Sequence, residues 1–296
     1  MRDFFLKGGV VAGIFWMCMA TLLTSFTGAF VRHLGGSVPT MELVFFRNFF
    51  ALIMLAPWFL RLGASGMRTH RLPLYGLRVT FAYLSMLMQF YALSQMQIAK
   101  VYALQFTIPL FTILLAVLVL KQSASIHSWV ACLIGFAGAL IVMRPGFIEI
   151  TLAVMLTMFS AVLSAGSNTT IKLLARTESP GVITVYTNLL MMPCAFVPML
   201  FVWVTPTPEQ WPWIIGMGVT GSVGGYCFTR AVSSADARVV QPFQFSRMIF
   251  ATGIGFAMFA ELPDLWTWVG AGVIFAASYY VLLHEKNRRQ SEGGGR

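Results

Sequence analysis

The chain has 296 residues, of which 58% are hydrophobic and only 10% are charged, and Lys and Arg outnumber Asp and Glu by 20 to 10. About a quarter of the residues of a soluble domain are charged, so this composition excludes a soluble globular protein. The mean hydropathy of +0.78 indicates an integral membrane protein. The basic residues are dispersed rather than gathered in one patch, so the net charge of +10 requires no nucleic-acid partner.

Long apolar runs follow one another along the whole chain. A helix needs roughly 20 apolar residues to cross a hydrocarbon core about 30 Å thick, and ten such helices fit the sequence. The predicted spans are residues 10–31, 41–61, 73–94, 98–120, 125–143, 150–172, 181–203, 211–230, 238–260 and 265–284. The first run shows no small-residue cleavage site with a polar follower, so we expect it to remain as the first helix and not to be cleaved.

The charges between the spans predict the orientation. If the N-terminus lies in the cytoplasm, fourteen Lys and Arg residues face the cytoplasm, and only Arg32, Lys100 and Arg144 lie in the outside loops. Positive residues collect on the cytoplasmic side of membrane proteins, so both termini are expected there. The segment 285–296 is polar and ends in glycines, which predicts a disordered cytoplasmic tail.

The first five predicted helices recur in the second half of the chain. At one common offset the repeat pairs Tyr102 with Gln241, Gln105 with Gln244, and Trp129 with Trp268. An odd number of helices per half makes the second copy enter the membrane from the opposite side, so we predict two inverted repeats, 1–145 and 146–284. Chance similarity among apolar helices is the alternative interpretation.

Several stretches carry a family resemblance. They are Ser37–Arg47 before the second span, Tyr91–Leu93, Ile108–Thr112, Gly135–Gly138, Arg144–Pro145, Ala231–Ala237 and Glu261–Asp264. In order and spacing the chain resembles the EamA branch of the drug/metabolite transporter superfamily. That resemblance implies ten helices, a central cavity between the halves, and movement of small metabolites without ATP hydrolysis. The chain departs from many relatives at Lys121–Gln122, where they have an acidic residue after the fourth helix, whereas the second copy keeps Glu261.

Polar side chains deep in a predicted span are the candidates for substrate binding, because a charge there costs roughly 3 kcal/mol even on the mildest scale. Arg247 is the leading one, with Gln241 and Gln244 before it at steps of three residues on the same helix face. Tyr102 and Gln105 form the matching stripe in the first half, and a pseudo-two-fold axis would bring both stripes to one site. A structural role for Arg247, held by carbonyls or extended toward the interface, is the alternative.

Other polar residues give a weaker signal. Tyr83 and Asn168 are further candidates for the cavity wall, although helix packing explains each about as well. Arg47 and Arg78 each lie about six residues from a predicted helix end, so their side chains can equally extend to the interface. The four cysteines have no paired spacing, and we expect no metal, disulfide or cofactor.

These residues predict the kind of substrate. No acidic residue falls in the middle third of a span, which argues against a proton relay and favours facilitated diffusion or exchange. A guanidinium flanked by Gln and Tyr suits a carboxylate, phosphate or polarised carbonyl. We therefore expect a neutral or anionic metabolite, riboflavin-like or an amino acid, ahead of S-adenosylmethionine.

Two other classes of protein stay open. A membrane enzyme would need converging catalytic groups, and the four histidines lie near span ends without a visible nucleophile. A lipid-translocating or partner-dependent subunit is the second alternative. The expected setting is a bacterial inner membrane, with the bilayer and a small-molecule substrate as partners and a monomer or homodimer as the assembly.

Overall fold

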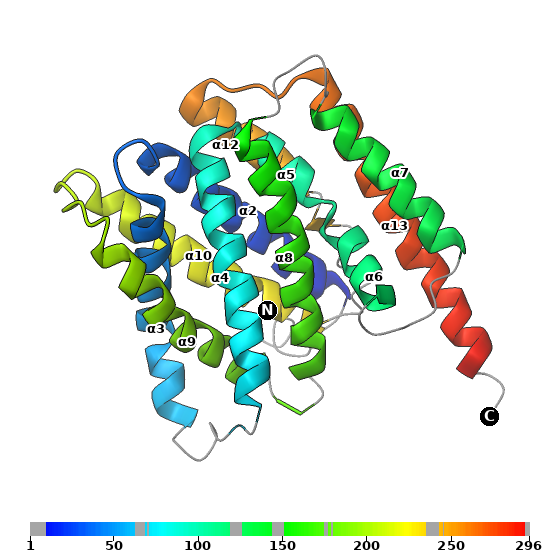
Figure 1. The fold of residues 1–296 in the computed structure, drawn as a ribbon, viewed down its shortest axis with the longest axis horizontal. Coiled ribbons are helices and arrows are strands. Elements are labelled where there is room, and N and C mark those ends of the chain that lie inside the picture. The colour runs from blue at the N-terminus through cyan, green and yellow to red at the C-terminus, as the bar shows by residue number, and fades with distance from the viewer. Residues whose placement is uncertain are drawn as a thin grey trace.

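The structure, a computed structural model, describes residues 10–62, 69, 71–118, 126–143, 151–174, 177, 178, 180–234, 243, 244 and 246–293. Within these ranges the regular elements are helices and no β-strand is present. The α-helices, shown in Figure 1, are α2 (Val10–Leu34), α3 (Thr40–Leu62), α4 (Leu72–Gln95), α5 (Ile98–Gln105), α6 (Ile108–Leu118), α7 (Ile126–Met143), α8 (Leu152–Leu174), α9 (Pro180–Leu200), α10 (Trp211–Ser234), α12 (Ser246–Phe259) and α13 (Leu265–Gly293).

Most helices match the predicted spans to within four residues at each end, but three segments differ. The predicted span 98–120 is two helices, α5 and α6. The predicted span 238–260 begins among residues outside the described ranges, and its described helix starts at Ser246. The last helix continues to Gly293, into the segment where the sequence predicts disorder.

The break between α5 and α6 has a local cause. Pro109 is the second residue of α6, and a proline has no N–H to donate to the carbonyl four residues earlier, here that of Gln105. The chain therefore turns at Phe106 and Thr107 before it resumes as a helix. At the common offset of the repeat, Thr107 corresponds to Ser246, where α12 begins.

Three described helical segments are both long enough and apolar enough to cross a membrane by themselves: Val11–Leu34, Leu152–Ile171 and Val182–Leu200. Shorter apolar segments are Ile98–Thr112, Leu133–Met143, Ser246–Phe259 and Leu265–Ala277. The remaining long helices carry charged or polar residues such as Arg47 and Arg78 within them.

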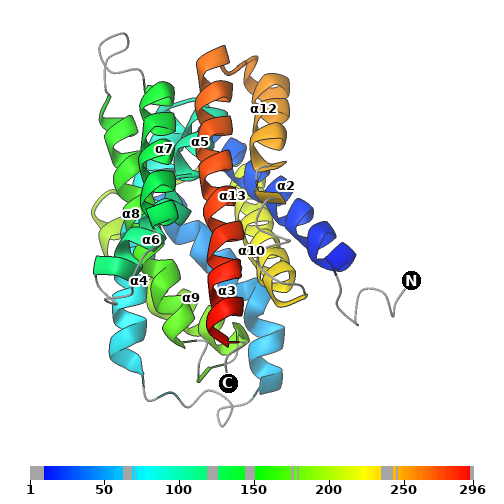
Figure 2. The ribbon, with the colours of Figure 1, turned by 90° about the vertical axis from the view of Figure 1, so that its right-hand side faces the viewer.

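Helices of the first half pack mainly against helices of the second half. The most extensive contacts join α2 with α10, α7 with α13, α4 with α8, and α3 with both α10 and α9. In the repeat, α2 corresponds to α8 and α4 corresponds to α10. The α2–α10 and α4–α8 pairs are therefore equivalent, and the packing follows the repeat. Figures 1 and 2 both show α7 and α13 side by side, and Figure 1 shows this pair at the edge of the bundle, away from α3 and α9.

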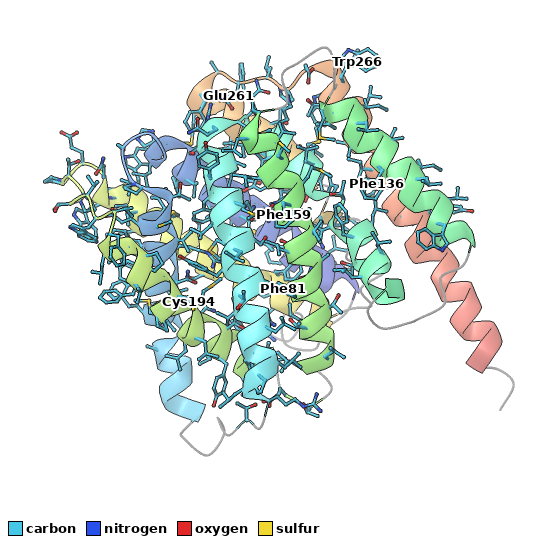
Figure 3. All side chains as sticks on the ribbon, viewed as in Figure 1. Phe81, Phe136, Phe159, Cys194, Glu261 and Trp266 are labelled. Atoms are coloured by element: carbon cyan, nitrogen blue, oxygen red, sulfur yellow. The ribbon has the colours of Figure 1, made fainter. Side chains whose placement is uncertain are left out.

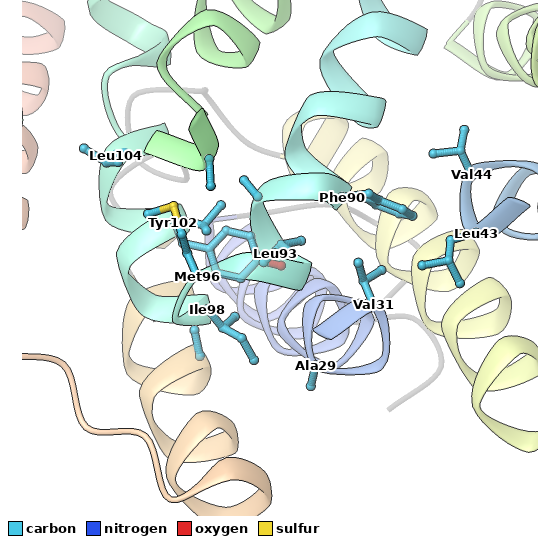
Figure 4. Packing of buried hydrophobic residues seen from close by; sticks show 14 of the residues in the cluster. Ala29, Val31, Leu43, Val44, Phe90, Leu93, Met96, Ile98, Tyr102 and Leu104 are labelled. Atoms are coloured by element: carbon cyan, nitrogen blue, oxygen red, sulfur yellow. The ribbon is translucent and has the colours of Figure 1, made fainter. Parts of the chain in front are cut away.

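A continuous apolar core joins the two halves. Ala29 and Val31 of α2 and Leu43 of α3 belong to it, together with Phe90 and Leu93 of α4 (Figure 4). Large apolar side chains also cover the outside, including Leu133, which is 70% exposed, and Met155, which is 61% exposed. An exterior of this kind is suited to lipid and would be a liability in water.

Candidate functional site

A cavity of about 240 Å³ lies between the two halves. Its described walls come from α2, α3, α4, α5, α8, α10 and α12. The lining residues are Thr24, Thr27, Gly28, Arg47, Ala82, Ser85, Met86, Gln89, Phe90, Leu93, Tyr102, Ser164, Ser167, Asn168, Gly221 and Arg247. Two of them are arginines and none is Asp or Glu, so the described wall is positively charged.

Arg247 and Tyr102 contact each other across the interface between the repeats. The guanidinium carbon of Arg247 lies 4.5 Å from the centroid of the Tyr102 ring, which is a cation–π distance. The Arg247 Nε donates a hydrogen bond to Thr24 Oγ1 at 3.4 Å, and the Tyr102 hydroxyl donates to the Thr24 carbonyl at 2.9 Å. A residue of the first helix therefore fixes both side chains.

The start of α12 is attached to α2 by hydroxyl groups. Thr21 Oγ1 and Ser246 Oγ are 2.8 Å apart, and the Ser25 hydroxyl donates to the Arg247 carbonyl at 3.3 Å. Both α2 residues are buried, so water competes little with these bonds. They hold the backbone of Arg247 at the cavity wall.

Arg47 reaches the cavity from the middle of α3. Its Nη1 is 3.6 Å from the sulfur of Met86, and a Cβ added to Gly221 would lie 3.3 Å from its Nε. The acid on the same helix does not pair with it: Glu42 is fully buried, and its Oε2 accepts a hydrogen bond from the Val204 N–H at 3.2 Å. Arg47 thus points into the cavity, and its side chain does not extend to the interface.

Neutral polar groups complete the wall. Gln89 Nε2 donates to Gln105 Oε1 at 3.2 Å, and Gln105, only 5% exposed, leaves its Nε2 without a hydrogen-bond partner among the described residues. Ser85 Oγ and Ser164 Oγ are 2.6 Å apart and join α4 to α8. The cavity therefore offers both donors and acceptors around its two cations.

The predicted site residues fall into three groups. Arg247, Tyr102, Arg47 and Asn168 line the cavity. Gln105 does not line the cavity but accepts a hydrogen bond from Gln89, which does. The described Gln244 and the buried Tyr83 are not among the lining residues. Gln241 lies outside the described residues.

Sequence reasoning missed the polar face of α2. Thr24, Thr27 and Gly28 line the cavity, and Tyr102 packs closely against Gly28. Their spacing of three and four residues places them on one helix face. That spacing was the available signal, but threonine and glycine are also common where membrane helices merely pack.

Arg32, outside the cavity lining, connects α2 to α4 and to the second repeat. Its Nη2 pairs with Glu261 Oε1 at 2.9 Å, and its Nη1 donates to the Ser94 carbonyl at 2.6 Å. A Cβ at the neighbouring Gly35 would meet the Ser94 Cα at 3.0 Å, so α2 and α4 touch here. Figure 3 shows Glu261 at the same end of the bundle as Trp266. In the described residues, the repeat-related pair α8 and α10 is not among the closely packed pairs.

Comparison with known proteins gives relatives that match this chain over most of its length. A riboflavin transporter of Brucella anthropi is 31% identical over 84% of this chain and 89% of its own. An S-adenosylmethionine uptake transporter of Rickettsia prowazekii is 24% identical over 95% of each chain. A pseudopaline exporter of Pseudomonas aeruginosa is 25% identical over 95% of this chain and 98% of its own.

A solved crystal structure shares the fold, with a TM-score of 0.64 over 94% of this chain and 98% of that chain at 15% identity. The model of the EamA-like transporter family matches twice, at residues 11–144 and 151–283, so the described helices form two copies of one repeat. The chain is a multi-pass integral membrane protein and belongs to the EamA-like transporter family.

Proposed function

We propose that this protein is a secondary transporter that carries a small organic metabolite through the central cavity by alternating access, without ATP hydrolysis. The cavity between the repeats carries this proposal, because its wall is built by helices of both halves around Arg247 and Arg47. Such sites at the interface of inverted repeats are where secondary transporters bind their substrates. The sequence contains no phosphate-binding loop of the kind that nucleotide hydrolysis needs.

The composition of the wall supports a neutral or anionic substrate. The lining combines two guanidinium groups with the hydroxyls of Thr24, Ser85 and Ser164, and it presents no described carboxylate. Riboflavin-like compounds and amino acids fit this set of groups, since both carry carbonyl or carboxylate oxygens. Phe90 adds an aromatic side chain to the lining.

Alternating access requires the two ends of the cavity to open in turn. If both termini lie in the cytoplasm, the end of the bundle that carries the Arg32–Glu261 ion pair faces outward. The repeat counterparts on the inner side are Lys172 and Lys121–Gln122, which contain no acid. By sequence, these counterparts cannot form an equivalent acid–base pair with each other.

S-adenosylmethionine is the second candidate substrate, because a relative of similar length is named for its uptake. Its sulfonium is cationic and would approach two arginines without a described acid in the wall. A lipid-translocating or partner-dependent role is a further alternative. Relatives include both an uptake transporter and an exporter, so the direction of transport is left to experiment.

Flux through purified protein tests the proposal directly. The full-length chain is reconstituted in liposomes loaded with riboflavin, an amino acid mixture or S-adenosylmethionine, and exchange with the labelled compound outside is followed without ATP. Exchange of one compound that is lost in Arg247→Gln is the expected result. No exchange of any compound by the wild-type protein would overturn the proposal and favour the lipid or partner-dependent role.

A further inference from the structure

The two arginines of the cavity come from different halves of the chain. Arg47 belongs to α3 and Arg247 to α12, and both lie against the polar face of α2. Arg247 Nε donates a hydrogen bond to Thr24. A Cβ added to Gly221 would lie 3.3 Å from Arg47 Nε and 3.7 Å from the Thr27 methyl group, so Arg47 lies near Thr27. Three residues of a helix rise by roughly 4.5 Å, so one small ligand can reach both guanidinium groups.

Neither guanidinium is neutralised by a described residue. The one ion pair among the described residues joins Arg32 to Glu261, away from the cavity. Arg247 is placed on the Tyr102 ring and Arg47 beside the Met86 sulfur, and neither contact supplies a formal negative charge. The carboxylate of Glu42, on the same helix as Arg47, accepts the N–H of Val204 at Oε2, and its Oε1 has no hydrogen-bond partner among the described residues.

Two cations at this depth are costly unless something compensates them. Even the mildest scale assigns roughly 3 kcal/mol to a charge at the centre of a membrane helix, and two like charges near one another add repulsion. A packing role would be served equally well by apolar residues of similar volume. The cost is offset if a negatively charged ligand occupies the space between the two groups.

From this geometry we propose that Arg47 and Arg247 together bind one carboxylate or phosphate group of the substrate, so that the cavity selects organic anions over matched neutral compounds. The inference rests on the proposed transport function and narrows its substrate class. Arginine presents a planar fork that binds such groups through paired hydrogen bonds, so two arginines can hold the oxygens of one group from both sides.

This arrangement also ties binding to the movement of the halves. Without a ligand the two guanidinium groups repel each other across the repeat interface. A bound anion attracts both, which draws α3 of the first half and α12 of the second half toward the same point. The substrate charge therefore favours a closed, occupied cavity and disfavours a closed, empty one.

Matched ligand pairs test the inference. The thermal unfolding midpoint of the purified full-length protein is measured with riboflavin and riboflavin 5′-phosphate, with glutamine and glutamate, and with inorganic phosphate. Ligand binding to the folded state raises the midpoint. We expect the anionic member of at least one pair to half-saturate the shift at a concentration tenfold or more below its neutral partner.

The variants Arg47→Gln and Arg247→Gln are each expected to remove this difference, whereas Arg47→Lys and Arg247→Lys keep part of it. Arg230→Gln is the matched control, because Arg230 stacks on Trp16 and Tyr226 outside the cavity lining and should leave the difference unchanged. Unliganded midpoints of all variants show whether each one folds. If inorganic phosphate raises the unfolding midpoint and no organic anion does, the site binds a free anion and the substrate inference is overturned.

Liposome exchange of the same compounds separates the two possible failures. Equal or better binding of the neutral members, with exchange intact and unchanged in both Gln variants, would overturn the anion inference and leave the transport function standing. Absence of exchange with every compound would overturn the transport function itself.

Discussion

The guanidinium of Arg32 lies 2.9 Å from the carboxylate of Glu261, and this contact joins the end of α2 to the segment after α12. It is the one ion pair found among the described residues, and it connects the first repeat to the second. The side chains are 24% and 16% exposed, so solvent weakens the pair only partly. The contact is thus suited to hold one end of the cavity closed and still release it.

The first prediction concerns the strength of this pair. Arg32→Gln and Glu261→Gln should each lower the thermal midpoint, and the double variant should lose less than the sum, with a coupling of about 0.5–1 kcal/mol. The singles should also raise access of a water-soluble reagent to the outer end, measured by labelling a cysteine placed at Ser94. A closing role would be contradicted if the losses of the two single variants in thermal midpoint simply add in the double variant and the labelling at position 94 does not change.

The backbone turn before Glu261 gives a second prediction. Ala260 has φ 54, a left-handed conformation that disfavours residues with a Cβ and favours glycine after a helix end. Ala260→Gly should therefore stabilise the protein by about 1 kcal/mol, measured as a higher thermal midpoint. Gly253→Ala, within the preceding helix α12 and with open space around the added methyl group, is the comparison. A lower midpoint for Ala260→Gly would refute the strain at this position.

The third prediction targets the stacked pair of the cavity. A Cβ at Gly28 would lie 3.1 Å from the Tyr102 Cζ, so Gly28→Ala should push this ring away from the Thr24 carbonyl and from Arg247. Ligand affinity should fall about tenfold, the equivalent of about 1.4 kcal/mol, with a smaller change in stability. Gly76→Ala, which has no atom within 4 Å, is the control. Unchanged ligand titrations in Gly28→Ala would remove Tyr102 from the site.

The contact between α7 and α13 supplies a fourth prediction. A Cβ at Gly270 would lie 2.6 Å from the Gly138 carbonyl oxygen and 3.0 Å from the Val142 nitrogen, both backbone atoms that cannot turn aside. Gly270→Ala should force the helices apart and cost about 1–3 kcal/mol. Gly272→Ala, two residues along the same helix with open space around it, should be neutral or slightly stabilising. Equal midpoints for both variants would contradict close backbone packing.

The sequence predicted the helices well, because apolar length and the charges between runs are strong signals. Arg247 was a candidate because of its depth in a span, Tyr102 because of its place in the repeat, and Arg47 as a weaker signal near a helix end. The structure brings all three to one cavity. Their role in substrate binding stays a prediction. The predicted span 98–120 did not resolve the break at Phe106–Thr107, which Pro109 follows in the sequence.

The rest depends on how helices rotate against each other, which apolar periodicity does not specify in a chain whose outside is also apolar. Tyr83 and Gln244 have the right depth but are not among the lining residues. Thr24 and Thr27 give a signal that packing residues also give, and only their contacts with Arg247 and Gly221 distinguish them.

The pairing of helices across the halves has a consequence for synthesis. Each of the most extensive helix pairs joins an early helix to a late one, as α2 joins α10 and α7 joins α13. A ribosome that has delivered only the first five helices to the membrane has therefore produced few of the contacts that hold the finished bundle. Until the second half arrives, lipid must cover the faces of α2, α3, α4 and α7, and premature termination after residue 145 should yield an inserted but unassembled fragment for quality control to remove.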